Sequence, residues 1–215
     1  MKNQPTTPRA LLPLVAITAL LLPQAEAGTR MVSDKRIVAT TSSPFDAGKM
    51  ELQSATGAYY SVGHSSQPTL NYSSSSLRLG VMLNSPSGDG WMRGNWEPMI
   101  QLFGGSSFEG PHGSLGGAAL VLRYNFVQPD ARWVPYVQIG VGAVYNNIYK
   151  DHAQRSIGQA WELDLEAVVG IRYFFCESWS ANLEGGYRNI ANMGMNDRDV
   201  GLNSLGAGIG LGYHF

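Results

Sequence analysis

The sequence predicts an all-β protein, an eight-stranded antiparallel β-barrel of up-and-down topology that crosses a bacterial outer membrane. Three observations support this prediction. The N-terminus has the pattern of an export signal, no later apolar run is long enough for a membrane helix, and segments of roughly ten to fourteen residues alternate apolar and polar side chains. Only 14% of the residues are charged, against roughly 25% in a typical soluble domain.

The first 27 residues are predicted to be a signal peptide. Lys2 and Arg9 give the positive start, residues 10–22 are apolar, and residues 25–27 (Ala-Glu-Ala) form the small-x-small sequence that precedes a cleavage site. We therefore expect cleavage after Ala27. The apolar run is shorter than the roughly 20 residues that a membrane helix requires, which makes an uncleaved anchor the weaker alternative.

Residues 28–50 are expected to form a flexible N-terminal arm. They are polar, show no alternation, and contain the turn-forming sequence Thr-Thr-Ser-Ser-Pro at positions 40–44. The barrel is therefore expected to occupy residues 51–215, a length that suits one domain.

Eight alternating segments follow the arm, each long enough for a tilted transmembrane strand. The alternation is clearest in the sixth segment, where the odd-numbered residues from Trp161 to Tyr173 are apolar and acidic residues lie between them. The predicted strands are residues 51–63, 70–83, 94–106, 113–126, 133–147, 158–175, 178–189 and 202–215.

A soluble β-sandwich also alternates, so further features are needed to favour a membrane barrel. The predicted inner faces carry glycines and charges of both signs, which can fill a narrow interior and pair there. Aromatic residues gather near strand ends, as in the interfacial girdles of outer-membrane barrels. The predicted interior charges are Arg78, Glu97, Arg123, Glu162, Asp164, Glu166, Arg172, Glu184 and Arg188. The predicted girdle residues are Trp96, Tyr124, Phe126, Trp133, Tyr136, Tyr145, Trp179 and Tyr187.

The C-terminus supports the same assignment. A terminal Phe215 that closes an alternating strand resembles the signal by which the barrel assembly machinery recognises outer-membrane proteins. Both ends of the barrel are expected to lie in the periplasm. The closed topology leaves no free strand edge, as a membrane requires, because lipid cannot hydrogen-bond an exposed backbone. The expected outward loops are residues 64–69, 106–112, 146–157 and 190–201, and the expected periplasmic turns are residues 84–93, 127–132 and 175–178.

Composition and motifs argue against several classes of function. The net charge of −1 gives no electrostatic footprint for nucleic acid. The glycines at 140 and 142 do not precede a helix, so they predict no phosphate loop, and the four histidines lack the spacing of metal ligands. We therefore expect no metal and no cofactor. The single cysteine, Cys176, excludes an internal disulfide, and a small barrel filled by its own side chains is not expected to transport solutes.

Residues 187–192 (Tyr-Arg-Asn-Ile-Ala-Asn) and 201–203 (Gly-Leu-Asn) resemble the signature of the lipid A 3-O-deacylase family of outer-membrane barrels. The resemblance covers nearly the whole chain after the arm, from about residue 52 to residue 215. It implies a barrel whose relatives act on lipid A. Further segments that carry it, in order, are residues 94–97 (Gly-Asn-Trp-Glu), 122–126 (Leu-Arg-Tyr-Asn-Phe), 135–142 (Pro-Tyr-Val-Gln-Ile-Gly-Val-Gly) and 157–159 (Ile-Gly-Gln).

The signature aligns without a gap, and its catalytic positions are substituted. The resemblance implies that the general-base histidine falls on Asn189, the nucleophilic serine on Ala191 and the orienting glutamate on Asn203. The oxyanion asparagine is retained as Asn192, and a further family asparagine falls on Asp199. The alanine side chain has no nucleophilic group, and the carboxamide of asparagine cannot act as a general base. Loss of a whole catalytic triad costs about 10⁶-fold in rate. We therefore expect a non-catalytic site.

Period-two parity places the substituted positions on the outer face of the barrel. In the seventh strand the outward parity that includes Tyr187 continues to Asn189 and Ala191, and in the eighth strand it reaches Asn203. These positions are expected to face lipid at the outer end of the last hairpin. We expect Asn189, Asn192 and Asn203 to contact lipid, through hydrogen bonds to lipopolysaccharide at the level of the headgroups.

Three functions stay open at this point. The first is a barrel of this family that does not hydrolyse lipid A. It would contact lipid A or have a structural role in the membrane. The second is an active lipid A esterase that uses substitute residues, Asp199 or Ser204 with His152. The third is a small adhesin, in which a loop such as residues 146–157 binds a partner. The oligomeric state is open as well.

Overall fold

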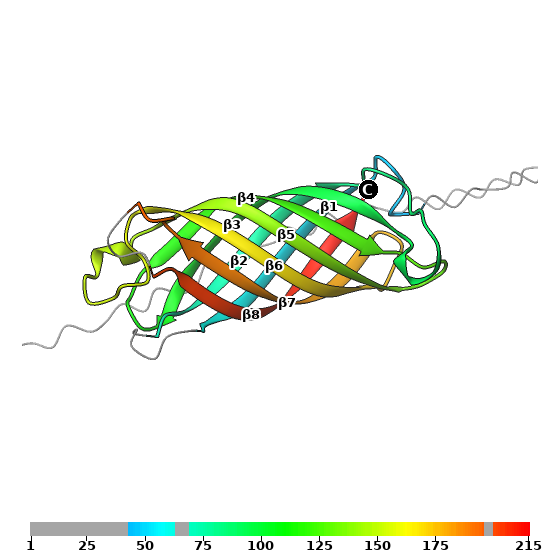
Figure 1. The fold of residues 1–215 in the computed structure, drawn as a ribbon. Helices are drawn as coiled ribbons and strands as arrows, with labels where there is room; N and C mark the ends of the chain where they lie inside the picture. The colour runs from blue at the N-terminus through cyan, green and yellow to red at the C-terminus, as the bar shows by residue number, and fades with distance from the viewer. Residues whose placement is uncertain (1–42, 63–68, 196–199) are drawn as a thin grey trace, which may run out of the picture. The chain divides into compact units, whose positions relative to one another are not determined.

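The computed structural model describes residues 43–62, 69–195 and 200–215; the predicted signal peptide, residues 28–42 of the predicted arm and Asp199 lie outside the described residues. Eight antiparallel strands close into a barrel in which each strand pairs with the next and the last pairs with the first (Figure 1). This confirms the predicted fold class. The strands are β1 (Met50–Ser61), β2 (Asn71–Val81), β3 (Gly94–Glu109), β4 (Ser114–Phe126), β5 (Trp133–Asn146), β6 (Trp161–Phe174), β7 (Trp179–Ala191) and β8 (Leu202–His214).

The strand bounds follow the prediction to within a few residues, and two differences have local causes. β3 continues to Glu109 because its last residues pair with the start of β2 across a register shift. β6 begins only at Trp161 because a turn precedes it. In that turn the Gly158 and Gln159 amides donate to Glu162 Oε1 at 2.7 and 3.2 Å.

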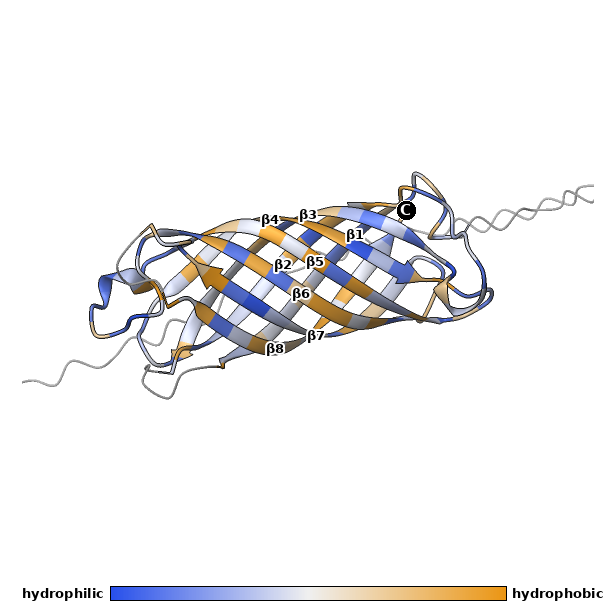
Figure 2. Ribbon diagram, viewed as in Figure 1, coloured by the Kyte–Doolittle hydropathy of each residue, from blue (hydrophilic) through white to orange (hydrophobic). Residues whose placement is uncertain are grey.

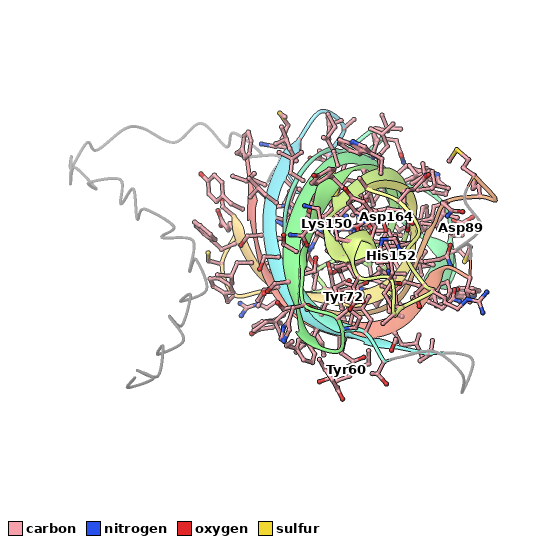
Figure 3. All side chains as sticks on the ribbon, turned by 90° about the vertical axis from the view of Figure 1, so that its left-hand side faces the viewer. Tyr60, Tyr72, Asp89, Lys150, His152 and Asp164 are labelled. Carbon is pink, nitrogen blue, oxygen red and sulfur yellow. The ribbon has the colours of Figure 1, made fainter. Side chains whose placement is uncertain are left out.

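Both ends of the described barrel chain lie at one end of the barrel. The Met50 amide donates to the Phe215 carbonyl at 2.9 Å, and the Phe215 amide donates to the Met50 carbonyl at 3.0 Å. We call this the terminus end, and the opposite end, where β7 finishes and β8 starts, the loop end. Figure 3 looks onto the loop end, with Asp164 inside the barrel and Tyr60 outside its wall.

Two single-turn 3-10 helices, η1 (Gly90–Met92) and η2 (Ile148–Lys150), lie in the connections between strands. Among the described residues, neither is long and apolar enough to cross a membrane.

Hydropathy alternates along the strands, as Figure 2 shows. All nine predicted interior charges are buried, while large apolar side chains are exposed on the outer face. Glycines on the inner face make room for the large polar groups: a Cβ at Gly80 would overlap the Glu97 carboxylate, and one at Gly170 would overlap the Tyr136 ring. This distribution is the inverse of a soluble protein, in which apolar side chains fill the interior.

The buried charges form a paired network across the interior. Arg188 donates to both oxygens of Asp164 at 2.7 Å, and Arg78 lies 2.5 Å from Glu184. Arg172 and Arg123 both contact Glu51 Oε2, at 2.5 and 3.1 Å. Such charge-assisted bonds compensate for the loss of water around each ion and fill the space that a larger barrel would leave as a pore.

Apolar clusters close the barrel above and below this network. At the loop end, Ile148 and Ile157 from the β5–β6 connection are fully buried in an apolar cluster with side chains of β2, β3, β4, β5, β7 and β8. At the terminus end, Phe45 is 2% exposed and packs with Met82, Val127, Val134 and Phe174. The sequence analysis predicted that Phe45 belongs to a flexible arm. Residues 43–49 instead form a turn fixed to the barrel, in which Asn95 Nδ2 donates to the Phe45 carbonyl at 3.2 Å.

The predicted aromatic girdle is present with one correction. Trp133 is 58% exposed, as expected, but Tyr136 is 1% exposed and points inward. The reason is parity, because Tyr136 lies an odd number of residues from Trp133 on the same strand. Its hydroxyl donates to Glu184 at 2.7 Å and its ring lies 4.3 Å from the Arg123 guanidinium, so it belongs to the interior network.

Candidate functional site

The candidate site lies on the outer face of the last hairpin, at the loop end. Asn189 of β7 and Asn203 of β8 are directly opposite each other in the antiparallel register. Their immediate neighbours on each strand, Arg188 and Ser204, are buried, so both asparagines project outward. This is the placement that period-two parity predicted. Two positions distant in the family signature therefore meet as a cross-strand pair.

The two carboxamides are hydrogen-bonded to each other. Asn189 Nδ2 donates to Asn203 Oδ1 at 2.7 Å. The Tyr187 hydroxyl, two residues back on the same face of β7, donates to the same oxygen. Asn203 Oδ1 thus accepts two hydrogen bonds, which use its two lone pairs. The sequence analysis placed Tyr187 only in the girdle and missed this contact, although its shared parity with Asn189 was a usable signal.

Two polar atoms of the pair keep free hydrogen-bonding capacity. Within the part of the chain that the structure describes, Asn203 Nδ2 donates to no group and Asn189 Oδ1 accepts from none. Both residues are partly exposed on the outer face. The pair therefore offers one donor group and one acceptor group to whatever lies against the barrel.

Ala191 completes the outer face beside the pair. Its side chain is a single methyl group, and Gly201 lies close to it: a Cβ on Gly201 would be 3.5 Å from Ala191 Cβ and 3.6 Å from Asn189 Nδ2. Gly201 has φ +73°, which suits glycine at the turn into β8. The site surface is consequently shallow at this point, and no hydroxyl or thiol is present at position 191.

The other predicted asparagine is placed differently. Asn192 is buried, and its Oδ1 accepts the Gly194 amide at 3.1 Å as the chain leaves β7. It follows Ala191, so it has the opposite parity to Asn189. The structure therefore brings Asn189 and Asn203 together on the outer face and places the Asn192 side chain away from them, in the turn.

The substitute catalytic residues do not come together. Ser204 is buried inside the barrel, where its hydroxyl lies 2.9 Å from that of Tyr72 and donates to the Arg188 carbonyl at 3.2 Å. His152 is exposed in the β5–β6 connection over the loop end (Figure 3). The barrel wall separates Ser204 from the outer face that carries Asn203. Asp199 lies outside the described residues.

The surface around the pair is apolar. Toward the membrane centre lie Tyr187, which is 40% exposed, and Leu205, its cross-strand partner. Beyond the strands, Met193 and Met195 of the β7–β8 connection are 70% and 69% exposed. Val62, whose amide donates to the Asn203 carbonyl at 2.8 Å, is also exposed. Among the described residues, apolar side chains thus lie on both sides of the polar pair, toward the middle of the strands and toward the loop end.

The interior offers a less suitable site. The cavity between Arg78, Gln101, Glu166 and Arg188 has a volume of about 20 Å³, which is enough for about one water molecule. Among the described residues, no three His, Cys, Asp or Glu side chains are arranged to hold a metal ion. The outer-face pair is therefore the main candidate.

Comparison with known proteins identifies the family. The family model described as lipid A 3-O-deacylase (PagL) matches residues 57–212, well over half of the chain. The chain belongs to the PagL family. It is therefore an outer-membrane β-barrel, and the family resemblance seen in the sequence is confirmed. No curated protein sequence matches it significantly.

Two solved outer-membrane proteins share the fold. Neisserial surface protein A (NspA) is 12% identical with a TM-score of 0.59, covering 78% of this chain and 99% of its own. The outer membrane enzyme PagL is 14% identical with a TM-score of 0.52, covering 74% of this chain and 97% of its own. At these identities the comparisons establish the fold alone.

Proposed function

We propose that this PagL-family barrel is non-catalytic and binds lipid A, or the lipopolysaccharide that contains it, through the outer face of the β7–β8 hairpin. The observation that carries the proposal is the Asn189–Asn203 hydrogen bond at the positions where the family signature has its histidine and glutamate. In this chain the two positions form a cross-strand pair, with carboxamides where the signature has ionisable groups.

The chemistry of these residues supports binding without hydrolysis. Ester hydrolysis by a triad requires a nucleophile and a base that accepts its proton. Position 191 carries a methyl group, and Asn189 directs its amide nitrogen, a donor, at Asn203. Neither residue can activate an attacking oxygen. Partly buried polar atoms on a lipid-facing surface are costly unless a partner satisfies them, and lipid A groups at this depth are suitable partners.

The orientation of the barrel follows from the same proposal. The loop end faces the outer leaflet, where lipid A is located, and the terminus end faces the periplasm, where Phe215 is available to the barrel assembly machinery. The exposed aromatic pair of Tyr145 and Trp161, with ring centroids 5.3 Å apart, then lies at the outer interface. The pair of Trp179 and Tyr213, 4.9 Å apart, lies at the inner interface.

Mass spectrometry of lipid A tests the absence of hydrolysis. Lipid A is extracted from cells that express the protein and from cells that express an active family member. We expect all 3-O-linked acyl chains to be retained in the first sample and lost in the second. Loss of a 3-O-linked chain in the first sample would show that the protein is an active deacylase.

A gain-of-function variant tests whether the site has kept the family geometry. The triple variant Asn189→His, Ala191→Ser, Asn203→Glu restores the signature on an unchanged backbone. We expect detectable deacylation by the triple variant and none by the variant that restores only Asn189→His and Asn203→Glu, which lacks the nucleophile. Equal activity of the two variants would contradict the assigned role of position 191.

A further inference from the structure

The hydrogen-bonding capacity that the asparagine pair leaves unused defines what it can recognise. Tyr187 and Asn189 both donate to Asn203 Oδ1, which leaves Asn203 Nδ2 as a donor and Asn189 Oδ1 as an acceptor. A ligand that satisfies both atoms must supply one acceptor and one donor. An ester supplies only acceptors, whereas a secondary amide supplies a carbonyl and an N–H.

The surroundings of the pair define the depth at which the ligand binds. Tyr187 and Leu205 lie on the membrane side of the pair, and Met193 and Met195 are exposed on the loop side. The pair therefore lies within the apolar belt and contacts the start of an acyl chain. Sugar rings and phosphates lie further from the membrane centre.

Charge supports the same conclusion. The outer faces of β7 and β8, which the structure describes in full, carry no Lys or Arg, and Arg188 of β7 points inward to Asp164. On these two strand faces a phosphate group would meet no cation. An uncharged linkage is the group that these residues fit.

A path for the alkyl chain continues from the pair toward the membrane centre. Below Tyr187 and Leu205 the next outward pair in the register is Gly185 and Ala207, which have at most a methyl side chain. The following pair, Leu183 and Ile209, is large and well exposed. An acyl chain can therefore lie close to the backbone at Gly185 and Ala207, beside the Tyr187 ring.

We propose that the Asn189–Asn203 pair binds the amide linkage of an N-acylated lipid, with Asn203 Nδ2 donating to the amide carbonyl and Asn189 Oδ1 accepting the amide N–H. This inference rests on the proposed lipid-binding function and specifies its ligand. In the relatives the signature residues hydrolyse an ester-linked chain, whereas the site in this chain is selective for the amide-linked one.

The test compares two monosaccharide lipids that differ in one linkage: glucosamine with an N-linked dodecanoyl chain, and glucose with the same chain ester-linked at the same carbon. Each is titrated into the full barrel in lipid nanodiscs while NMR follows the side-chain amide signals of Asn189 and Asn203. We expect both signals to shift with the amide lipid and its dissociation constant to be about tenfold lower than that of the ester lipid, the effect of one further hydrogen bond.

The variant Asn203→Asp tests the assigned donor, because it replaces Nδ2 by an acceptor while keeping the oxygen that Tyr187 and Asn189 contact. We expect this variant to lose the preference for the amide lipid. Asn147→Asp is the matched control: it introduces the same charge in an exposed residue at the loop end, and its oxygen can still accept the Ser114 amide. The control should keep the tenfold preference.

The outcomes separate the two proposals. Equal affinity for both lipids, with shifts at Asn203, would overturn the amide preference and leave lipid binding at this site intact. Preserved preference in Asn203→Asp would also overturn the assignment of the donor. If neither lipid binds or shifts the two signals, both the amide inference and the proposed function are wrong.

Discussion

Replacement of Arg123 by methionine should be among the most destabilising single changes in this barrel. The Arg123 side chain, on β4, is completely buried and connects four other strands. Its contacts are Gln53 at 2.6 Å and Glu51 at 3.1 Å on β1, Glu97 at 3.7 Å on β3, Gln138 at 2.9 Å on β5 and Glu184 at 3.7 Å on β7.

The magnitude follows from what the substitution leaves behind. Methionine fills much of the volume, so the packing loss is small, but the carboxylates of Glu51 and Glu97 lose a shared cation inside the barrel. Removing one partner of a buried ion pair costs about 3–5 kcal/mol, because the remaining charge is left uncompensated. Arg172 still contacts Glu51 at 2.5 Å but lies 3.9 Å from Glu97, so Glu97 is the carboxylate that loses most of its compensation.

Denaturant unfolding in lipid vesicles, followed by tryptophan fluorescence, measures the change in the free energy of unfolding. Arg155→Met is the control: Arg155 is exposed in the β5–β6 connection, and its loss should change stability by less than about 0.5 kcal/mol. Adding Glu97→Gln to Arg123→Met should recover part of the loss, because it removes the unpaired charge. If Arg123→Met costs no more than Arg155→Met, the network does not stabilise the barrel and this reasoning is refuted.

Three further predictions concern the closed ends and the outer site. Phe45→Ala should lower the free energy of unfolding by about 3–5 kcal/mol in the same assay, because it empties the apolar cluster at the terminus end. Planar-bilayer recordings of the native barrel and of Phe45→Ala should both show no conductance above background. The reason is that the cluster around Ile148 still closes the loop end. A steady channel in the native protein would disprove the filled interior. Tyr187→Phe should cost only about 0.5–1.5 kcal/mol and should shift the Asn203 side-chain amide signal in NMR spectra; an unchanged signal would mean that the hydroxyl does not contact Asn203.

The strands and the interior could be predicted from the sequence because both depend on period-two parity. A residue such as Glu166 could be assigned to the interior from its two neighbours alone, and the outward placement of Asn189 and Asn203 followed from the same rule. The girdle assignment of Tyr136 was wrong because it relied on position near a strand end and ignored parity. In a barrel of this kind, strand parity first decides whether an aromatic side chain points inward or outward. Its distance from the strand end then decides whether an outward side chain lies in the girdle.

Contacts between distant segments could not be predicted in this way. Phe45 lies in a segment without alternation, and only the folded barrel shows that its ring covers the terminus end beside Phe174, 5.5 Å away. The pairing of Asn189 with Asn203 depends on the register of β7 and β8, which the sequence limits to one parity without fixing the residue. Neither contact leaves a periodic signal.

The asparagine pair itself can be tested as a structural or a functional feature. If the pair were present for stability, replacing both residues should leave the barrel less stable than the native protein. Each single change, Asn189→Leu or Asn203→Leu, leaves the other carboxamide without its partner near lipid and should cost about 1–3 kcal/mol. The double change removes both polar groups and should be nearly neutral or stabilising, because leucine is favourable on a lipid-facing surface.

A double-mutant cycle in vesicles measures the coupling between the two positions. A double variant as stable as the native barrel would mean that folding does not require the pair, and a costly polar pair that folding does not require is best explained by binding. A double variant that is less stable than the native barrel by about as much as either single variant would instead identify the pair as a structural hydrogen bond. In that case the amide preference would have to be shown by the lipid titration alone.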